Sequence, residues 1–235
     1  MRALLALMAL GSLAACVHAQ AVGEMDRAGF VDAVSVVPDL IVDMRYYGSE
    51  NFVGRRIAGY EASVCLLTSQ AAAALKDAQA GLQPFGLGLK LFDCYRPRRA
   101  VADFVSWAKD LSDQKRKQEQ YPRIDKARLF ELGYIAERSG HSRGSTLDLT
   151  VIDLRTQAEL DMGGPYDLFD TQSWPTDQSV GPAARANRLI LQQVMGSAGF
   201  KPLAEEWWHF TLRDEPFPDT YFDFPVAPDG RVNRP

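Results

Sequence analysis

Histidine and cysteine are scarce in this chain of 235 residues, which contains three of each. The formal net charge is −4, and this argues against nucleic acid as a partner because nucleic-acid interfaces need a basic face. After the first twenty residues no stretch reaches about 18 consecutive apolar residues, so we expect no transmembrane helix in the mature protein. Hydrophobic residues make up 46% and charged residues 24%, which is ordinary for one compact globular domain.

The first residues have the layout of an export signal. Arg2 precedes a short apolar run over residues 3–13 that ends in small residues. The sequence Leu-Ala-Ala-Cys ending at Cys16 resembles a lipobox and predicts a signal over 1–15 with a lipid anchor on Cys16. The competing site, Val-His-Ala ending at Ala19, predicts a signal peptide over 1–19 and a mature domain over 20–235. A buried N-terminal helix is the remaining alternative. Both export interpretations place the protein in the periplasm, anchored to the outer membrane if Cys16 is lipidated.

Either cleavage leaves Cys65 and Cys94 as the two cysteines of the folded domain. An even pair in an oxidising compartment is compatible with a disulfide. Two buried thiols are the alternative, because the sequence does not give the distance between the two Cα atoms.

Apolar patterns and turn residues predict a mixed fold. Strands are expected over 40–47, 88–95, 147–151 and 207–212, and helices over 68–80, 98–108 and 183–198. Thr68 or Ser69 is expected to cap the first helix, and Gly81 to end it. The charged segment 109–126 is expected to be a solvated helix end and a surface loop. Because the elements do not alternate as βαβ units, we predict a single α+β domain with a mainly antiparallel sheet flanked by helices.

Two motifs bring the few histidines together with carboxylates. Residues 139–150 read SGHSRGSTLDLT, so that a turn with His141 leads into a strand with Asp148, and EEWWH ends at His209. The third histidine, His18, precedes the domain. A single histidine is more often structural, but two histidines and one carboxylate with an open fourth position form a catalytic zinc site. We therefore predict one Zn²⁺ per chain, bound in a central cleft, which would lower the pKa of its water to about 7.

Two further side chains suit hydrolysis at such a metal. Glu206 lies three residues before His209 and is the expected general base, with Glu205 as the competitor; an exposed acidic pair is the alternative for both. Arg96 ends a predicted strand and is expected to stabilise an oxyanion. Its alternative role is a structural ion pair with Asp93.

These motifs resemble the VanX-type D-alanyl-D-alanine dipeptidases, which are zinc peptidases. The resemblance rests on the SxHxxGxAxD pattern, on EWWH and on DxYRP, and it runs over about residues 43–224. It implies zinc ligands at His141, Asp148 and His209, a base at Glu206 and a transition-state cation at Arg96. Two small departures are Thr146, where the pattern has alanine, and Gly140, which we expect to make the loop freer.

The resemblance also implies a substrate and the residues that bind it. Asp167 corresponds to the carboxylate that receives the free ammonium of D-Ala-D-Ala, Ser139 helps to hold the substrate, and Tyr46 and Asp93 correspond to other pocket residues. A pocket that requires a free ammonium would accept dipeptides only, in cell-wall peptide turnover or scavenging. The alternatives are a D,D- or L,D-carboxypeptidase that acts on peptidoglycan stem peptides, and a non-catalytic zinc domain that binds the cell wall.

Overall fold

The computed structural model describes residue 25 and residues 28–228. The predicted export signal, its two cleavage sites and Cys16 lie outside these residues. The main sheet has the strand order β2, β4, β5, β7, β6. Its strands are β2 (Ile41–Val42), β4 (Leu87–Asp93), β5 (Thr146–Asp153), β7 (His209–Leu212) and β6 (Phe200–Pro202). Strand β2 runs parallel to β4 and the other neighbours pair antiparallel, so the predicted α+β fold with a mainly antiparallel sheet is confirmed.

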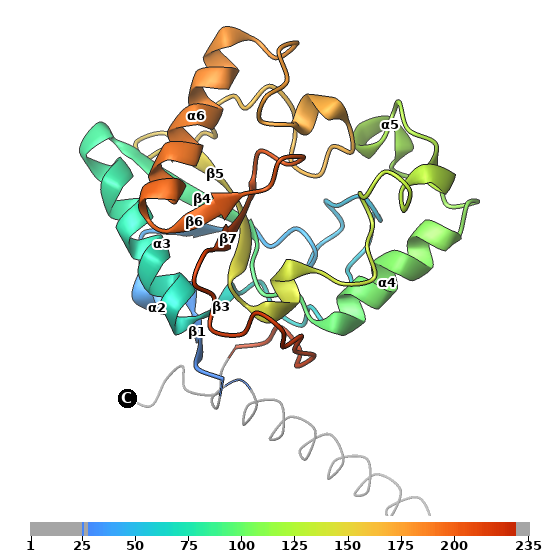
Figure 1. Cartoon of the computed structure of the whole chain (residues 1–235), viewed down its shortest axis with the longest axis horizontal. Coiled ribbons are helices and arrows are strands. Elements are labelled where there is room, and N and C mark those ends of the chain that lie inside the picture. The colour runs from blue at the N-terminus through green and yellow to red at the C-terminus, as the bar shows by residue number, and fades with distance from the viewer. Residues whose placement is uncertain (1–24, 26–27, 229–235) are drawn as a thin grey trace, which may run out of the picture.

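Helices lie on both sides of this sheet. In Figure 1, α3 (Ser69–Leu82) and α6 (Pro182–Ser197) lie together to the left of the strands, and α4 (Arg98–Lys109) and α5 (Lys117–Gln120) lie to the right. A small antiparallel sheet of β1 (Phe30–Asp32) and β3 (Leu66–Thr68) lies below, next to α2 (Ala33–Val36). The described residues also form four short 3-10 helices: η1 (Gln83–Phe85), η2 (Lys126–Arg128), η3 (Gly140–Arg143) and η4 (Thr171–Ser173). None of the helices within residues 28–228 is long and apolar enough to cross a membrane.

Helix α3 begins as predicted but ends later. The side chain of Thr68 accepts a hydrogen bond from the backbone N–H of Ala71, which makes it the N-cap. Gly81 was expected to end the helix, yet α3 continues to Leu82. A side chain at Gly81 would lie 3.1 Å from Val194 of α6, so this glycine permits close packing of the two helices. The chain turns at Gly86 instead, which has a φ of +71°.

Strand pairing in the main sheet determines which polar residues become neighbours. Strand β5 is buried along nearly its whole length, since it lies between β4 and β7. Its register places Asp148 opposite Asp93 of β4 on one side and opposite His209 of β7 on the other. Directly opposed residues in an antiparallel pair lie about 4.5–5.5 Å apart, so the sheet brings these three residues together at one end.

Two other predictions need correction. The strand predicted over 40–47 is limited to β2, because after two more bonds to β4, from the N–H groups of Asp43 and Arg45, the chain turns away from the sheet. The segment 109–126 is not simply solvated. Lys126 is fully buried, since its ammonium donates to the carbonyl oxygens of Asp110 and Asp113 and lies 3.8 Å from the ring of Trp107. Burial lowers the pKa of Lys126.

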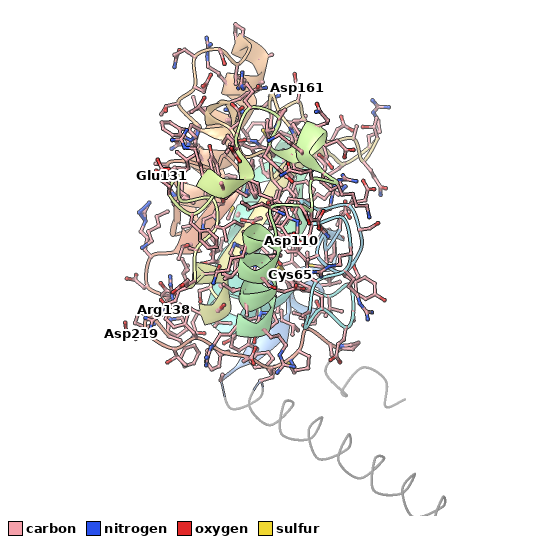
Figure 2. All side chains as sticks on the ribbon, turned by 90° about the vertical axis from the view of Figure 1, so that its right-hand side faces the viewer. Cys65, Asp110, Glu131, Arg138, Asp161 and Asp219 are labelled. Atoms are coloured by element: carbon pink, nitrogen blue, oxygen red, sulfur yellow. A yellow bond between two sulfur atoms is a disulfide. The ribbon has the colours of Figure 1, made fainter. Side chains whose placement is uncertain are left out.

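The two cysteines form a disulfide. Cys65 precedes β3, Cys94 follows β4, and their Cα atoms lie 5.3 Å apart. Both side chains are buried, and Cys65 lies in the middle of the molecule in Figure 2. The bond thus ties the small sheet to the end of β4, beside the residues described next.

Candidate active site

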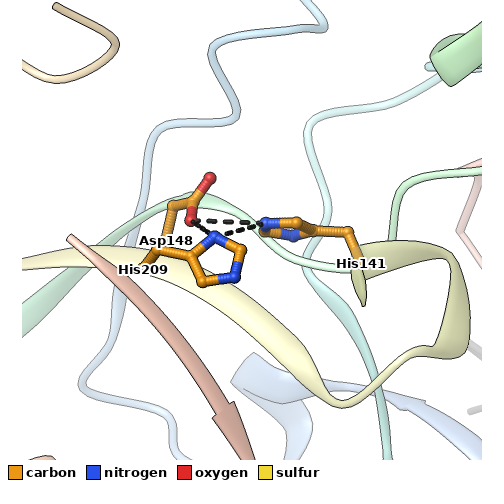
Figure 3. Close-up of side chains that lie close together, drawn as sticks. All are labelled: His141, Asp148 and His209. Atoms are coloured by element: carbon orange, nitrogen blue, oxygen red, sulfur yellow. Dashed lines mark hydrogen bonds and ion pairs between the residues drawn. The ribbon is translucent and has the colours of Figure 1, made fainter. Parts of the chain in front are cut away.

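Three side chains from separate elements converge on one point. His141 comes from η3, Asp148 from β5 and His209 from the first residue of β7 (Figure 3). The Oδ1 atom of Asp148 lies 3.3 Å from Nε2 of His141 and 3.1 Å from Nδ1 of His209. The two ring nitrogens are 3.3 Å apart. The structure therefore brings together the three residues that the sequence predicts as metal ligands.

The turn that carries His141 is held at both ends. The hydroxyl of Ser139 accepts a hydrogen bond from the backbone N–H of His141 at 3.3 Å. Gly144 ends η3 with a φ of +80°, and a side chain there would collide with the ring of Phe30. The ring of His141 donates from Nδ1 to the carbonyl oxygen of Cys94 at 2.7 Å, and this bond leaves the Nε2 lone pair directed at Asp148 and His209.

The cluster fits a bound cation. Oδ1 of Asp148 is buried, and ring nitrogens of both histidines face it at ion-pair distance. Burial opposes ionisation of Asp148, but His141 and His209 outweigh burial and hold the pKa of this carboxyl well below its usual range. Burial also lowers the pKa of His209, yet the carboxylates of Asp148 and Glu206 raise it to about 9. Two imidazoles and one carboxylate are a donor set that metal ions such as zinc accept.

The cluster lies in the wall of a cavity of about 260 Å³. Glu206 also lines this cavity, with Oε2 at 3.4 Å from Nδ1 of His209, whereas its competitor Glu205 points to solvent. Trp207 and Trp208, which follow Glu206, are buried and pack edge to face, so they hold the turn that leads into β7. Glu206 is therefore the acidic residue that the fold places beside the metal cluster.

Arg96 forms the ion pair considered for it and also has access to the cavity. It lines the cavity, and its Nε and Nη2 atoms each lie 2.9 Å from Oδ2 of Asp93. Its Nη2 lies 3.7 Å from Oδ2 of Asp148, and its Nη1 lies 3.4 Å from the hydroxyl of Ser139. Asp93 itself is fully buried behind the wall, where it also accepts a hydrogen bond from Tyr60 at 2.6 Å. Asp93 thus holds Arg96 in place rather than lining the pocket as the resemblance implied.

Asp167 lies at another part of the cavity wall, on the irregular segment between β5 and α6. It is buried and accepts hydrogen bonds from the hydroxyl of Tyr46 at 2.9 and 3.1 Å. Burial, together with the charge of Asp148, raises the pKa of Asp167 well above its usual value. Its φ of +61° is rare for a residue other than glycine and costs about 1 kcal/mol or more. A buried carboxyl with a raised pKa in the wall of a cavity is a candidate for a functional group.

A family comparison agrees with this geometry. A family model described as D-Ala-D-Ala dipeptidase matches residues 26–227. The chain belongs to the D-Ala-D-Ala dipeptidase family. Its members include D-alanyl-D-alanine dipeptidases of Streptomyces coelicolor and Enterococcus faecalis, to which the chain is 44% and 43% identical. The alignments cover 84% and 79% of this chain and 97% and 92% of those proteins. A D-alanyl-D-alanine dipeptidase of Escherichia coli is 35% identical over 80% of this chain and 86% of its own length.

Membership of the D-Ala-D-Ala dipeptidase family confirms the resemblance and makes the protein a metallopeptidase of dipeptidase type. The two departures from the family pattern turn out to be linked. Thr146 exchanges a hydrogen bond with Thr211 of β7 at 2.9 Å, and a side chain on Gly140 would lie 2.9 Å from the same Thr146 hydroxyl. Thr146, which is larger than the alanine of the family pattern, thus occupies space that a side chain at position 140 would need. Gly140 therefore has a packing role and does not simply make the loop freer.

Sequence reasoning missed two residues in this dipeptidase site. Tyr166 donates from its hydroxyl to Oδ2 of Asp148 at 3.0 Å. Arg188 of α6 is buried and donates to the carbonyl oxygens of residues 162, 172 and 174, so it fastens the segment that carries Asp167. A tyrosine in a loop and an arginine in an amphipathic helix carry no pattern that shows such contacts. The position of Tyr166 next to Asp167 was the available signal.

Proposed function

We propose that this protein hydrolyses the dipeptide D-Ala-D-Ala to two molecules of D-alanine, with a zinc ion held by His141, Asp148 and His209. The single observation that carries the proposal is the composition of one cavity. Its wall combines the His–Asp–His cluster with Glu206, Arg96 and a buried carboxyl at Asp167. Family membership and the names of the relatives support the same activity.

Zinc suits this site better than calcium or magnesium, because two of the three donors are imidazole nitrogens. When bound, zinc acts as a Lewis acid on the peptide carbonyl and makes water available as a nucleophile at neutral pH. The position of Oδ1 of Asp148 supports this assignment, since it meets ring nitrogens of both histidines at one buried point, where a bound cation would replace the proton of His209.

Glu206 is the proposed general base and acid. Its carboxylate lies beside the cluster, 3.4 Å from His209, and its side chain is 22% exposed, so it is accessible from the cavity. It takes a proton from the attacking water and returns this proton to the amine of the leaving D-alanine. Protonation of the leaving amine matters because an amide anion is a very poor leaving group.

Arg96 is the proposed stabiliser of the negative charge that develops on the carbonyl oxygen. The bonds from Asp93 hold the guanidinium in one orientation before the reaction, so little reorganisation is needed when the charge appears. Ser139 contacts the same guanidinium and lines the cavity, which supports a role in holding the substrate.

Asp167 is the proposed receptor for the ammonium of the substrate, with Tyr46 fixing its carboxylate. Burial keeps the carboxyl neutral in the free site, and the arrival of a cationic ammonium favours its ionised form. A longer peptide has an amide at this position and would leave the buried carboxyl without a counter-ion. This cost restricts the site to dipeptides.

The test is release of D-alanine from D-Ala-D-Ala by the purified mature protein, with and without a chelator, beside a stem pentapeptide and L-Ala-L-Ala. We expect chelator-sensitive cleavage of the D,D-dipeptide alone. Cleavage of the pentapeptide at a comparable rate would make the protein a wall-trimming carboxypeptidase. Metal binding without cleavage of any of the three peptides would leave a non-catalytic domain.

We also propose that the protein is exported and acts on D-Ala-D-Ala released from the cell wall. The signal layout of residues 1–19 supports export, and so does the buried disulfide between Cys65 and Cys94, since such bonds persist in oxidising compartments. Fractionation of cells, with mass spectrometry of the mature N-terminus, distinguishes a lipidated Cys16 from cleavage after Ala19. Recovery of uncleaved active protein from the cytosol would contradict export.

A further inference from the structure

Two tyrosine hydroxyls connect the metal cluster to the carboxyl proposed to bind the ammonium. The hydroxyl of Tyr166 lies 3.0 Å from Oδ2 of Asp148 and 3.2 Å from the hydroxyl of Tyr46. The hydroxyl of Tyr46 in turn donates to Asp167. All four groups are buried, so the line from Asp148 to Asp167 is shielded from solvent. Hydrogen bonds in such surroundings are stronger than in water.

The ring of Tyr166 has a packing role that is separate from its hydroxyl. It stacks on Phe92 of β4 at 4.7 Å between ring centroids and meets Trp208 edge to face at 5.3 Å. Phenylalanine at this position would keep both ring contacts. The hydroxyl would not be needed if Tyr166 served packing alone, and a tyrosine hydroxyl that is buried normally has a partner.

The two oxygens of Asp148 have different surroundings. Oδ1 faces the ring nitrogens of His141 and His209 at 3.3 and 3.1 Å, while Oδ2 receives the hydroxyl of Tyr166. The next group near Oδ2 is the guanidinium of Arg96, whose Nη2 lies 3.7 Å away, beyond hydrogen-bond distance. Tyr166 therefore supplies the close hydrogen bond that fixes the rotation of this carboxylate about its last torsion angle.

We propose that Tyr166 is a positioning residue whose hydroxyl orients Asp148 for metal binding and lies in contact with the hydroxyl of Tyr46. The hydroxyl holds Oδ2, and this leaves Oδ1 directed at the point where the two histidines converge. Removal of the hydroxyl frees the carboxylate to rotate and leaves Oδ2 buried without a donor. The metal-binding part of this inference does not depend on the substrate, whereas the connection to Tyr46 rests on the proposed function.

The experiment compares Tyr166→Phe with Tyr46→Phe, which removes the same atom from the next residue along the line. Affinity for Zn²⁺ is measured on metal-free protein by competition with a chromogenic chelator. We expect Tyr166→Phe to bind zinc about 10- to 100-fold more weakly, as is typical when a group behind a metal ligand is lost. We expect Tyr46→Phe to keep the wild-type zinc affinity within about twofold and to raise KM for the dipeptide instead.

Thermal unfolding of the metal-free variants separates positioning from folding. Wild-type zinc affinity in a folded Tyr166→Phe variant would overturn the inference, as would an equal loss of zinc affinity in both variants. The proposed function fails separately, if the wild-type protein binds zinc but does not cleave D-Ala-D-Ala. In that event the difference in zinc affinity between the two variants would still decide the role of Tyr166.

Discussion

Asp148 and Asp167 line the same cavity but have opposite surroundings. Asp148 lies on the central strand β5, and its two histidine neighbours hold its pKa well below the usual range. Asp167 lies in an irregular segment at a φ of +61°, and burial raises its pKa well above the usual value. The first carboxyl is charged in the free protein, which suits a permanently bound cation. The second would become charged when a cation arrives, which is what the proposed binding of the substrate ammonium requires.

The two carboxyls also belong to differently built parts of the site. We call the His141, Asp148, His209 and Glu206 group the sheet side, because strand pairing or the turn into β7 places each of these residues. We call residues 162–174 the loop side, because contacts from Tyr46 and Arg188 hold this segment. Chemistry is thus assigned to the sheet side and substrate recognition to the loop side. The following predictions test this division.

The largest effect is expected on the sheet side, from Glu206→Gln. Loss of the general base should lower kcat about 10²- to 10⁴-fold while bound metal is retained, because the amide keeps the shape of the side chain but cannot accept the proton. The matched control is Glu205→Gln, which changes the solvent-facing neighbour. Steady-state kinetics with metal analysis makes the comparison. Equal losses in the two variants would remove the assignment of Glu206.

On the loop side, Asp167→Asn should lower kcat/KM for D-Ala-D-Ala about 10- to 100-fold, since a hydrogen bond to a charged group contributes about 1.5–3 kcal/mol. N-acetyl-D-Ala-D-Ala lacks the ammonium and provides the control, because its slow cleavage should not fall further in the variant. The ratio of the two efficiencies, measured for both proteins, isolates the charge interaction. An unchanged ratio would separate Asp167 from ammonium recognition.

The sequence was informative about the two sides to different degrees. On the sheet side, His141 and Asp148 stand in a turn and a strand whose local patterns predicted both elements, and His209 lies within the strand predicted over 207–212, which the structure shortens to β7. Pairing of neighbouring strands then brings these residues together, so local patterns and topology were sufficient. Tyr166 and Arg188 act through contacts between the loop side and elements distant from it in sequence, β5 for Tyr166 and α6 for Arg188. No periodicity records such contacts, and Asp167 was found through the family resemblance alone.

Elsewhere the sequence failed where tertiary packing overrides a local rule. Gly81 was expected to end the helix, but α3 continues through it, and the missing side chain permits close packing on α6. Lys126 belongs to a charged segment that is expected in solvent, yet three neighbours hold its ammonium in the interior. For Gly81 the neighbouring atoms belong to α6, and for Lys126 they are two backbone carbonyl oxygens and the ring of Trp107. Sequence patterns do not specify contacts of either kind.

We expect Arg188 to hold the loop side in position, as strand pairing holds the sheet side. Arg188→Met removes the donor for three carbonyl oxygens and should lower the free energy of unfolding by about 2 kcal/mol. It should also raise KM, because the segment that positions Asp167 loosens. Arg185→Met is the control, since Arg185 lies on the same helix but donates to the carbonyls of residues 178 and 180. Urea unfolding and steady-state kinetics measure both effects. A change in kcat alone would contradict the division.

A smaller effect is expected from the linked pair Gly140 and Thr146 on the sheet side. Gly140→Ala places a methyl group 2.9 Å from a stiff, hydrogen-bonded threonine, so it should destabilise the protein by about 1–2 kcal/mol. Thr146→Ala should partly relieve this cost, although it leaves Thr211 without its partner. In a double-mutant cycle of unfolding free energies, the two changes should couple by about 1 kcal/mol. Strict additivity would show that the two departures are independent.

The smallest expected effect is the release of the His209 proton when a metal ion binds. His209 has a pKa of about 9 in the metal-free protein, so it carries a proton at pH 6 that a bound metal must displace. Zinc binding at pH 6 should therefore release about one proton, since a water on the metal, with a pKa of about 7, stays protonated there. The pKa of His209 is raised above its ordinary 6.5, so the proton stabilises the metal-free fold below about pH 6.5. This stabilisation is lost as the pH rises through about 9.

Proton release is measured with a pH indicator in weak buffer, and unfolding of the metal-free protein is followed between pH 6 and 9.5. The control is Asp167→Asn, because Asp167 is a buried carboxyl of the same cavity whose pKa is also raised, and the variant should release the same number of protons. If the variant released none, the proton would come from the loop side. The metal and the substrate would then be coupled through Asp167, and the two sides would titrate as one unit.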